Sequence, residues 1–323
     1  MQIELKKRIL VSTRLLPDGF SELTKHFDVI FPESREFSKA EVIELLPTVD
    51  AFVSSFQFRV DKDVINAAKE RVKIIANYGV GYNNIDVDYA AQNGIIVTNT
   101  PDPVIEPTAE HAFALMLAAA RRISECDRKL RMSEGLKWGI LENLGQSLFG
   151  KTLGIVGMGR IGQAVARRGL ASGMKIVYFN RGRLEAELEH KYQAQRLELV
   201  ELLKISDVVS LHVPLNEATY HLINKNNLQQ MKPNSILINT ARGSVVDEEA
   251  LVEALQNHRI YAAALDVYEF EPQISAELLK MENVVLSPHN GTATVETRNE
   301  MSRFASQNII RYFAGRTDIT RVN

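Results

Sequence analysis

The 323-residue chain is predicted to fold as an α/β protein made of two units, each a parallel sheet covered by helices on both faces. Three observations predict this class. Short apolar, β-branched runs alternate with helical stretches along the chain. These runs lack the polar alternation of a sheet with one face in water, which indicates that both faces are buried. The chain is also too long for one ordinary core, since domains usually hold about 100–200 residues.

The first unit begins with a series of short predicted strands. Helical spacing of apolar residues separates some of them, at residues 39–46 and 63–70. Strands joined through helices usually become parallel neighbours in one sheet. The predicted strands lie at residues 8–12, 28–31, 51–54, 72–76 and 94–98.

The pattern changes at Pro101-Asp102-Pro103. A long helix with a broad apolar face is predicted to follow, from about residue 104 past Arg122. The last predicted helix, residues 295–313, has no strand after it and is long enough to return to the first unit, which would make that unit discontinuous. Between the two helices, a second alternating series predicts strands at residues 152–156, 175–179, 207–212, 235–239, 262–266 and 284–286.

The composition argues against several classes of function. Lys plus Arg number 38 and Asp plus Glu number 40, so the chain has no basic field for nucleic acid. The longest apolar run, residues 112–120, is far shorter than the ~20 residues that span a bilayer. The single cysteine, Cys126, excludes an internal disulfide, and no His, Cys and carboxylate cluster has ligand spacing. We expect a cytoplasmic protein with a small-molecule substrate, no nucleic-acid partner, no membrane and no catalytic metal.

The segment Gly157-Met158-Gly159-Arg160-Ile161-Gly162 follows a predicted buried strand and opens a predicted helix. Its glycine spacing also occurs in ordinary turns, but this strand–turn–helix context is typical of dinucleotide binding. Gly157 suits the tight turn, Gly159 lets the backbone approach a pyrophosphate, and Gly162 allows close helix–strand packing. The free N–H groups of the helix would then bind the pyrophosphate.

Cofactor choice is predicted from the end of the next strand, where Asn180-Arg181-Gly182-Arg183 follows residues 175–179. An acidic residue there would accept hydrogen bonds from the adenosine ribose and indicate NAD. This chain offers two guanidinium groups instead, which suit a 2′-phosphate. The alternative is a solvated basic loop. We favour NADP (NADPH), with NAD as the second choice.

A second glycine segment, Gly79-Val80-Gly81, lacks the third glycine and is followed by Tyr82-Asn83-Asn84 before any predicted helix. We interpret it as a loop whose backbone N–H groups bind a small anion such as a carboxylate. The alternative is an ordinary turn after a strand.

Three polar side chains, Arg242, Glu271 and His289, each follow a predicted strand of the C-terminal half, and Asp266 ends the middle strand. Open α/β sheets place their chemistry at these strand ends. Reduction of a 2-oxoacid needs a cation for the carboxylate, as a fork-shaped Arg provides, and a proton donor near neutral pH, as His provides. A carboxylate beside the histidine favours its protonated form. Each residue alone is usually a surface group, so it is the combination that predicts a catalytic centre.

The other histidines have structural interpretations. His111, on the long helix, is expected to serve packing or capping, and His212 ends a strand where the chain is expected to pass the adenine. Four others lie in polar contexts and are expected to be exposed: His26, His190, His221 and His258.

Six ordered motifs resemble the D-isomer-specific 2-hydroxyacid dehydrogenase family over essentially the whole chain. The resemblance implies a Rossmann cofactor domain (residues 103–292) and a smaller flavodoxin-like substrate domain (residues 1–102 and 293–323). It also implies a homodimer formed through the cofactor domain. The motifs are residues 77–86, 153–162, 211–215, 239–243, 265–272 and 287–291.

The resemblance implies individual roles as well. Arg242 would bind the substrate carboxylate and carbonyl, His289 would be the general acid, and Glu271 would be its charge partner. Further substrate contacts would come from Tyr78, Val80 and Gly81. Besides the glycine turn and residues 180–183, the cofactor would contact Arg160, Ile161, His212, Val213, Pro214, Thr240, Ala241, Asp266 and Gly291.

Two departures narrow the resemblance. The basic segment at residues 180–183 is similar to the NADPH-preferring glyoxylate, hydroxypyruvate and 2-ketogluconate reductases. Asn290 stands beside His289 where an apolar residue is expected, and the sequence assigns it no role. Glu271 argues against formate dehydrogenase, whose histidine partner is an uncharged amide. The predicted reaction is hydride transfer from NAD(P)H to a small 2-oxoacid, which gives the D-2-hydroxyacid.

Two other functions are left open by the sequence. One is a non-enzymatic dinucleotide-sensing regulator of the same fold, which can keep the three catalytic side chains. The other is an NAD-dependent phosphoglycerate dehydrogenase, against which Arg181 and Arg183 argue. The physiological 2-oxoacid is not predicted, because the width of the pocket depends on side chains that the sequence does not place.

Overall fold

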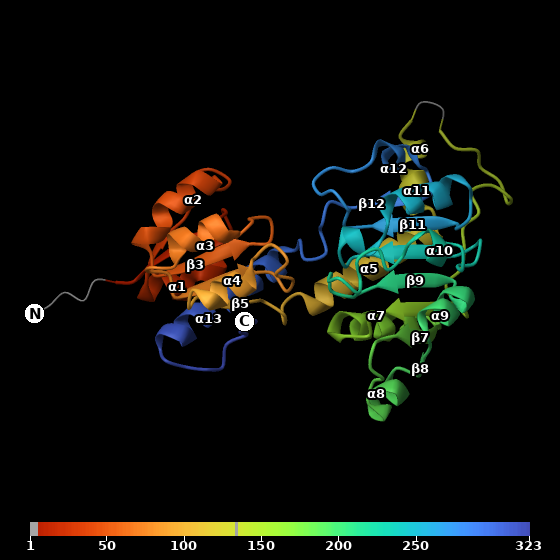
Figure 1. The fold of residues 1–323 in the computed structure, drawn as a ribbon. Helices are drawn as coiled ribbons and strands as arrows, with labels where there is room; N and C mark the ends of the chain where they lie inside the picture. The colour runs from red at the N-terminus through yellow and green to blue at the C-terminus, as the bar shows by residue number, and fades with distance from the viewer. Residues whose placement is uncertain (1–5, 133–134) are drawn as a thin grey trace, which may run out of the picture. The chain divides into compact units, whose positions relative to one another are not determined.

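The computed structural model describes residues 6–132 and 135–323, and the chain divides into two compact units (Figure 1). The first unit comprises Met1–Val104 and Thr292–Asn323, and the second comprises Ile105–Gly291. Each unit is built on one parallel sheet. This arrangement confirms the predicted α/β class. No helix in the described parts of the chain is both long enough and apolar enough to cross a membrane.

The sheet of the first unit has five strands in the order β2-β1-β3-β4-β5, which is the flavodoxin-like order. The predicted strand at residues 72–76 begins two residues too early. Val72 is apolar and buried, but it precedes the ladder and lengthens the apolar run. The strands are β1 (Arg8–Val11), β2 (Asp28–Ile30), β3 (Ala51–Ser55), β4 (Ile74–Tyr78) and β5 (Ile96–Thr98).

Helices cover both faces of this first sheet (Figure 1). On one face, α2 (Lys39–Leu45), α3 (Lys62–Ala68) and α4 (Val87–Gln92) bury their apolar side chains against Phe52 and Ile75. On the other face, Val53 and Ala76 pack with residues of three helical segments. These are η1 (Pro17–Phe20), α1 (Ser21–His26) and α13 (Val295–Phe313), and a short η2 (Leu46–Thr48) follows α2.

The second unit has a seven-stranded parallel sheet in the order β12-β11-β10-β9-β6-β7-β8. The strand order reverses between β6 and β9, and open α/β sheets bind ligands outside the carboxyl ends of their strands at such a switch point. The strands are β6 (Thr152–Val156), β7 (Lys175–Phe179), β8 (Ala194–Arg196), β9 (Val208–Leu211), β10 (Ile236–Asn239), β11 (Ala262–Leu265) and β12 (Val284–Leu286).

The long helix predicted from about residue 104 past Arg122 is divided in the structure. Helix α5 ends at Ala120, and Arg122 has a left-handed backbone (φ 55°) that turns the chain before the next helix. The helices of this unit are α5 (Ile105–Ala120), α6 (Ile123–Leu130), α7 (Arg160–Ala171), α8 (Ala186–Lys191), α9 (Leu199–Ile205), α10 (Lys225–Leu228), η3 (Gly243–Val245), α11 (Glu248–Gln256) and α12 (Ala276–Lys280).

Candidate active site

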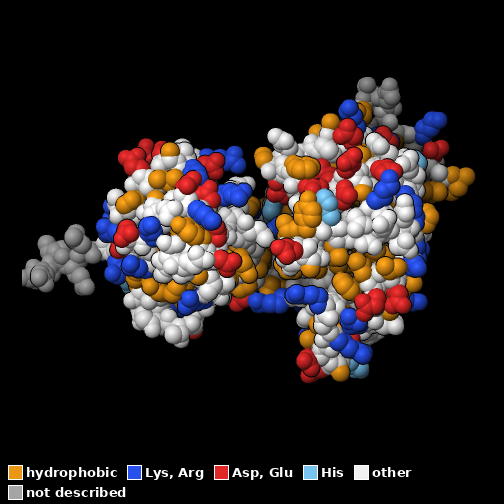
Figure 2. Space-filling model, in the orientation of Figure 1, with side chains coloured by type: hydrophobic (Ala, Val, Ile, Leu, Met, Phe, Trp, Pro, Cys, Tyr) orange, Lys and Arg blue, Asp and Glu red, His pale blue; other side chains and the backbone are white. Residues whose placement is uncertain are grey.

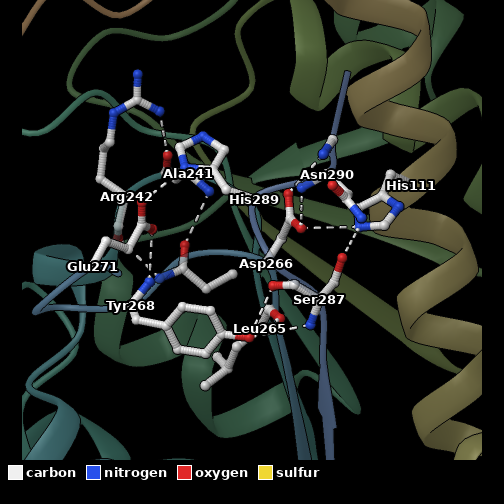
Figure 3. A network of polar contacts seen from close by, with 12 residues as sticks. His111, Ala241, Arg242, Leu265, Asp266, Tyr268, Glu271, Ser287, His289 and Asn290 are labelled. Atoms are coloured by element: carbon white, nitrogen blue, oxygen red, sulfur yellow. Dashed lines mark hydrogen bonds and ion pairs between the residues drawn. The ribbon is translucent and has the colours of Figure 1, made fainter. Parts of the chain in front are cut away.

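Strand register brings the three predicted catalytic segments to one level in the second unit. Asn239, the last residue of β10, pairs with Leu265 at the end of β11, and Leu265 pairs with Leu286 at the end of β12. The loops that follow these strands therefore leave the sheet side by side. They carry Arg242, Glu271 and His289, as Figure 3 shows.

His289 and Glu271 form a pair at 2.9 Å between the ring Nδ1 and Oε2. Both side chains remain about one-third exposed, at 31% and 36%. The other carboxylate oxygen of Glu271 accepts the backbone N–H of Tyr268 at 2.9 Å, so the carboxylate is turned back onto its own loop. This contact orients the ring through Nδ1 and leaves Nε2 on the opposite edge of the imidazole.

Asp266 holds the loop that carries His289 (Figure 3). Asp266 is 1% exposed, and its carboxylate accepts the N–H groups of Asn290 at 2.7 Å and Gly291 at 2.8 Å. Its backbone carbonyl accepts the N–H of His289 at 2.8 Å. These bonds fix His289 in a left-handed conformation (φ 55°), which is rare for a residue other than glycine. Both carboxylate oxygens of Asp266, which was predicted to contact the cofactor, thus accept hydrogen bonds from the loop.

His111 of α5 supports Asp266 from the side. Its Nε2 lies 3.2 Å from an Asp266 oxygen and 2.9 Å from the hydroxyl of Ser287. Burial raises the pKa of Asp266, but the bonds from His111 and from the N–H of Asn290 outweigh it and leave the pKa below its usual value. His111 therefore has a defined polar role, more specific than the packing or capping expected from its sequence context.

The phenol of Tyr268 ties β11 to the segment after β12. Its hydroxyl lies 2.9 Å from the carbonyl oxygen of Ser287 and accepts the N–H of Ser287 at 3.1 Å. Burial raises the pKa of Tyr268 to about 12, so the hydroxyl stays protonated near neutral pH. The two loops that carry Glu271 and His289 are thereby joined beneath the pair.

Arg242 projects from the turn after β10 (Figure 3). The buried Asn239 amide holds the turn on both sides, because it accepts the N–H of Ala241 at 3.0 Å and donates to the carbonyl of Arg242 at 2.9 Å. One guanidinium N–H donates to the carbonyl of Ala241 at 2.6 Å, and the others have no partner among the described residues. Burial lowers the pKa of Arg242 while nearby Glu271 raises it. A planar cation with free donors can bind a carboxylate.

Gly243 sets how closely the Arg242 turn approaches the Glu271 loop. A Cβ at this position would overlap the carbonyl group of Tyr268 and the backbone nitrogen of Glu269. Only glycine allows this approach without moving one of the loops. The sequence contained this glycine within a motif, but no local pattern assigned it the contact.

The glycine turn after β6 has the geometry of a dinucleotide site. Gly157 has φ 100°, and a Cβ there would lie 2.7 Å from the backbone of His212. Gly162 abuts the carbonyl of Gly157, whereas the space beside Gly159, the residue directly before α7, is open to 4 Å. Arg160 and Ile161 form the first turn of α7, whose N-terminus has no side-chain cap. Open space beside uncapped N–H groups fits a pyrophosphate.

Residues expected near the adenine lie across the switch point. His212 follows β9, with Val213 and Pro214 after it, and its Nε2 is 2.9 Å from the hydroxyl of Ser210. Burial lowers the pKa of His212 to about 4, so the ring is neutral near pH 7.

Other predicted cofactor residues lie at the catalytic end of the sheet. Thr240 and Ala241 follow β10, and the hydroxyl of Thr240 is a buried oxygen without a hydrogen-bond partner among the described residues. Gly291 ends the His289 loop, held by Asp266. An unpartnered hydroxyl at this place fits a polar ligand group such as a carboxamide.

The four residues after β7 are used in different ways. The Asn180 side chain accepts the N–H of Met158 at 2.7 Å and so braces the glycine turn. Arg181 is exposed and has no hydrogen bond or ion pair with another described residue. Arg183 instead pairs with Glu189 through two nitrogens, at 2.8 Å from Nη2. Sequence reasoning missed Arg196 of β8, whose Nη2 donates to the carbonyl of Asn180 at 3.2 Å.

The loop after β4 in the first unit is held by side-chain amides that donate to its carbonyl groups. The Asn77 amide donates to the carbonyls of Gly79 and Gly81 at 3.1 and 2.8 Å, and Asn99 donates to that of Val80 at 2.9 Å. The N–H groups of Val80 and Gly81 have no acceptor among the described residues. Unpaired N–H groups on a fixed loop suit an anion.

Tyr78, predicted to contact substrate, lies in the core of the first unit. Its hydroxyl donates to the carbonyl of Arg298 at 2.8 Å, and burial raises its pKa. The side chain is 1% exposed and its donor is already used, so any contact with a ligand is left to its backbone.

Comparison with known proteins decides the family. Residues 113–291 match the model of the D-isomer specific 2-hydroxyacid dehydrogenase NAD binding domain. A glyoxylate reductase from Thermococcus onnurineus is 44% identical, over 99% of this chain and 96% of its own length. The chain belongs to the D-isomer specific 2-hydroxyacid dehydrogenase family. It is therefore an oxidoreductase that uses a nicotinamide dinucleotide to interconvert a 2-oxoacid and a D-2-hydroxyacid.

Solved structures of the family agree with the fold over the full chain. A glyoxylate reductase from Paecilomyes thermophila is 36% identical with a TM-score of 0.88, and covers 98% of both chains. An NADPH-dependent glyoxylate/hydroxypyruvate reductase from Sinorhizobium meliloti, in complex with NADP and malonate, is 34% identical with a TM-score of 0.86. That match covers 98% of this chain and 97% of the other.

Sequence reasoning on this dehydrogenase also missed a second histidine–glutamate pair. His221, expected to be exposed, lies with its Nε2 2.6 Å from an oxygen of Glu269. The only signal in the sequence was Glu269, an acidic residue two positions before Glu271. His221 lies 48 positions before Glu269, and no local spacing connects the two. Within the described residues, no three His, Cys, Asp or Glu side chains are grouped as metal ligands.

Proposed function

We propose that this dehydrogenase is a cytoplasmic, NADPH-preferring reductase of glyoxylate and related small 2-oxoacids such as hydroxypyruvate. The main support for this reaction is the His289–Glu271 pair beside Arg242. These residues follow strands that end at the same level of a sheet, and the glycine turn belongs to that sheet. The substrate class is supported by full-length similarity to glyoxylate reductases. A single cysteine also fits a reducing compartment.

In the proposed reaction, the free guanidinium N–H groups of Arg242 bind the substrate carboxylate and polarise its carbonyl. His289, protonated and oriented by Glu271, gives a proton to the carbonyl oxygen. NADPH supplies the hydride when bound, and the uncapped start of α7 with Thr240 offers it N–H and hydroxyl groups.

We assign substrate binding to residues 1–102 and 293–323, and cofactor binding to residues 103–292. In the first of these, the unpaired N–H groups of Val80 and Gly81 are the proposed donors to a carboxylate. In the second, the glycine turn and residues 212–214 lie on both sides of the switch point.

Cofactor preference is proposed to depend mainly on Arg181. Asn180 carries no charge that would repel a 2′-phosphate, and Arg181 is exposed without a protein partner, whereas Arg183 is engaged by Glu189. A charge-assisted hydrogen bond contributes roughly 1.5–3 kcal/mol, which corresponds to about one to two decades in relative affinity. NADPH should be favoured over NADH by that factor.

The test is kcat/KM for NADPH and NADH with glyoxylate, hydroxypyruvate and 2-ketogluconate. Arg181→Ala should lower kcat/KM for NADPH by about tenfold or more and leave NADH unchanged. Arg183→Ala is the matched control, because the ion pair with Glu189 already uses that guanidinium. A parent enzyme that prefers NADH contradicts the cofactor proposal. Dinucleotide binding without turnover of any 2-oxoacid would favour the sensing regulator instead.

We also propose that the protein is a homodimer formed through its second unit. The segment that follows α6 exposes large apolar side chains, including Trp138 at 89% and Ile140 at 95%. Figure 2 shows orange side chains at the edge where this segment projects. Apolar surface of this kind is typical of an interface. Sedimentation should give about twice the mass of one chain, and Trp138→Ser with Ile140→Ser should give the mass of one chain.

A further inference from the structure

In the second histidine–glutamate pair, His221–Glu269, the glutamate lies in the loop that carries Glu271. The Glu269 side chain is only 10% exposed, and its Oε1 is 2.6 Å from Nε2 of His221. By contrast, the residues after Glu269, from Phe270 to Gln273, are all exposed. Glu269 is therefore the last point at which this loop is fixed to the body of the unit before Glu271.

Glu269 and Glu248, the first residue of α11, also bind each other reciprocally: the backbone N–H of each donates to the side-chain carboxylate of the other. The N–H of Glu248 donates to the Glu269 carboxylate at 3.2 Å, and the N–H of Glu269 donates to the Glu248 carboxylate at 3.0 Å. Both carboxylates are largely withdrawn from solvent. Each such bond to an ionised acceptor is stronger than a neutral one, so the loop is attached to the start of α11 at two points.

His221 connects this attachment to the turn that follows Arg242. Its backbone N–H donates to the carbonyl of Ser244 at 2.8 Å, and Ser244 lies in η3, directly after that turn. The backbone of His221 is left-handed (φ 47°), and its ring stacks on Tyr220 with centroids 4.0 Å apart. His221 thus bridges the segment after β10, through its backbone N–H, and the loop after β11, through its imidazole.

We propose that His221, Glu269 and Glu248 are positioning residues that hold the Glu271 carboxylate in place against His289. The inference deepens the proposed function and rests on the assignment of Glu271 as the charge partner of the general acid. Glu271 is itself exposed and bonded to Tyr268, a residue of its own loop, so its position relative to His289 depends on where the loop is attached. Loss of the attachment lets the carboxylate move away from Nδ1, and a displacement of about 1 Å can slow catalysis by up to a hundredfold.

The first experiment compares Glu269→Ala and His221→Asn with Glu269→Gln. Asparagine tolerates the left-handed backbone of His221, so only the imidazole is lost. Both disruptive variants should lower kcat with glyoxylate about tenfold, with KM for NADPH unchanged. Glu269→Gln can keep both contacts, because its oxygen can accept the N–H of Glu248 and its NH2 can donate to an unprotonated Nε2 of His221, so it should retain most of the activity. His258→Asn is the matched control, because His258 is exposed and has a similar backbone (φ 50°).

The deciding experiment is a double-mutant cycle with Glu271→Gln. If Glu269 acts through Glu271, Glu269→Ala should cost less than about twofold in kcat once Glu271 is glutamine. A tenfold loss in both backgrounds would overturn the positioning role and indicate a general structural effect. If Glu271→Gln alone leaves kcat and its pH dependence unchanged, the proposed role of Glu271 fails instead. The two failures are therefore distinguishable.

Discussion

Two histidine–glutamate pairs lie among the described residues of the second unit, and they differ in what surrounds the carboxylate. In the His289–Glu271 pair both side chains are about one-third exposed, and the second oxygen of Glu271 bonds only within its own loop. In the His221–Glu269 pair the carboxylate is 10% exposed and its second oxygen bonds across to α11. The same two residue types thus occur once as an open pair and once as a closed pair.

The difference indicates which pair can do chemistry. A pair that stays open to water and ligand can change its protonation state and deliver a proton. A pair whose carboxylate is bonded to two separate elements would have to break structure to do so, and it is suited to holding loops together. Residue type alone therefore does not identify a catalytic histidine, and the environment of its carboxylate does.

The largest expected effect separates the two pairs directly. His289→Asn keeps a residue that tolerates a left-handed backbone but removes the proton donor, so kcat for glyoxylate reduction should fall by about a hundredfold or more. His221→Asn should cost only about tenfold. NADPH binding, followed by its fluorescence, should be unchanged in both variants. Equal losses of kcat would show that the comparison between an open and a closed pair is mistaken.

The second effect concerns the cation beside the open pair. Arg242→Lys keeps a positive charge but loses the planar fork, so it should lower kcat/KM for glyoxylate by about ten- to a hundredfold. KM for NADPH should not change. Arg167→Lys is a suitable control, since Arg167 is an exposed ion-pair residue of α7 in the same unit. Parental kinetics in the Arg242 variant would place the substrate anchor elsewhere.

The open pair could be predicted from the sequence because its position is determined mainly by the topology of the sheet. Three chemically complementary residues each follow a strand, and parallel strands with level ends bring their following loops together. The glycine turn was recognisable for the same reason, since its function depends on local order of strand, turn and helix. Features that depend on one strand end or one turn were therefore predicted.

The closed pair was missed because it joins residues 48 positions apart through a left-handed backbone, and neither property has a local signal. The engagement of Arg183 by Glu189 was missed because it depends on how the loop after β7 folds back. β8 was missed because it is a three-residue edge strand with two polar side chains. Each of these features is set by tertiary contacts.

A third prediction tests how the open pair is held. Asp266→Asn leaves one acceptor oxygen for the two loop N–H groups, so one N–H faces an amide nitrogen. The free energy of unfolding should therefore fall by about 1–3 kcal/mol, and kcat should fall by about tenfold. The folded-state pKa of Asp266 lies below its unfolded value of about 3.9, so its stabilisation is complete above that pH and is lost as pH falls through the folded pKa. Urea unfolding should therefore show the parent–variant difference at pH 6 and a smaller one near pH 3. An undiminished difference at pH 3 would mean that the carboxylate charge is not the cause, and exposed Asp63→Asn is the control.

The smallest expected effect comes from a histidine near the cofactor turn whose ring contacts a hydroxyl and, within the described residues, pairs with no carboxylate. Burial lowers the pKa of His212 to about 4, and its Nε2 contacts Ser210. Because an unfolded histidine has a pKa of about 6.5, the neutral ring stabilises the fold fully above pH 6.5, and this contribution is lost as pH falls toward 4. His212→Gln removes the titration, so the parent should lose on the order of 1 kcal/mol more stability than the variant between pH 7 and pH 5. All other ionisable groups are the same in both proteins, so the difference between the two urea-unfolding curves reports His212 alone, and exposed His258→Gln should show no such difference. If the free energy of unfolding of His212→Gln falls as steeply as that of the parent when the pH is lowered, burial does not keep this ring neutral. The contrast between histidines with and without a carboxylate partner would then be wrong.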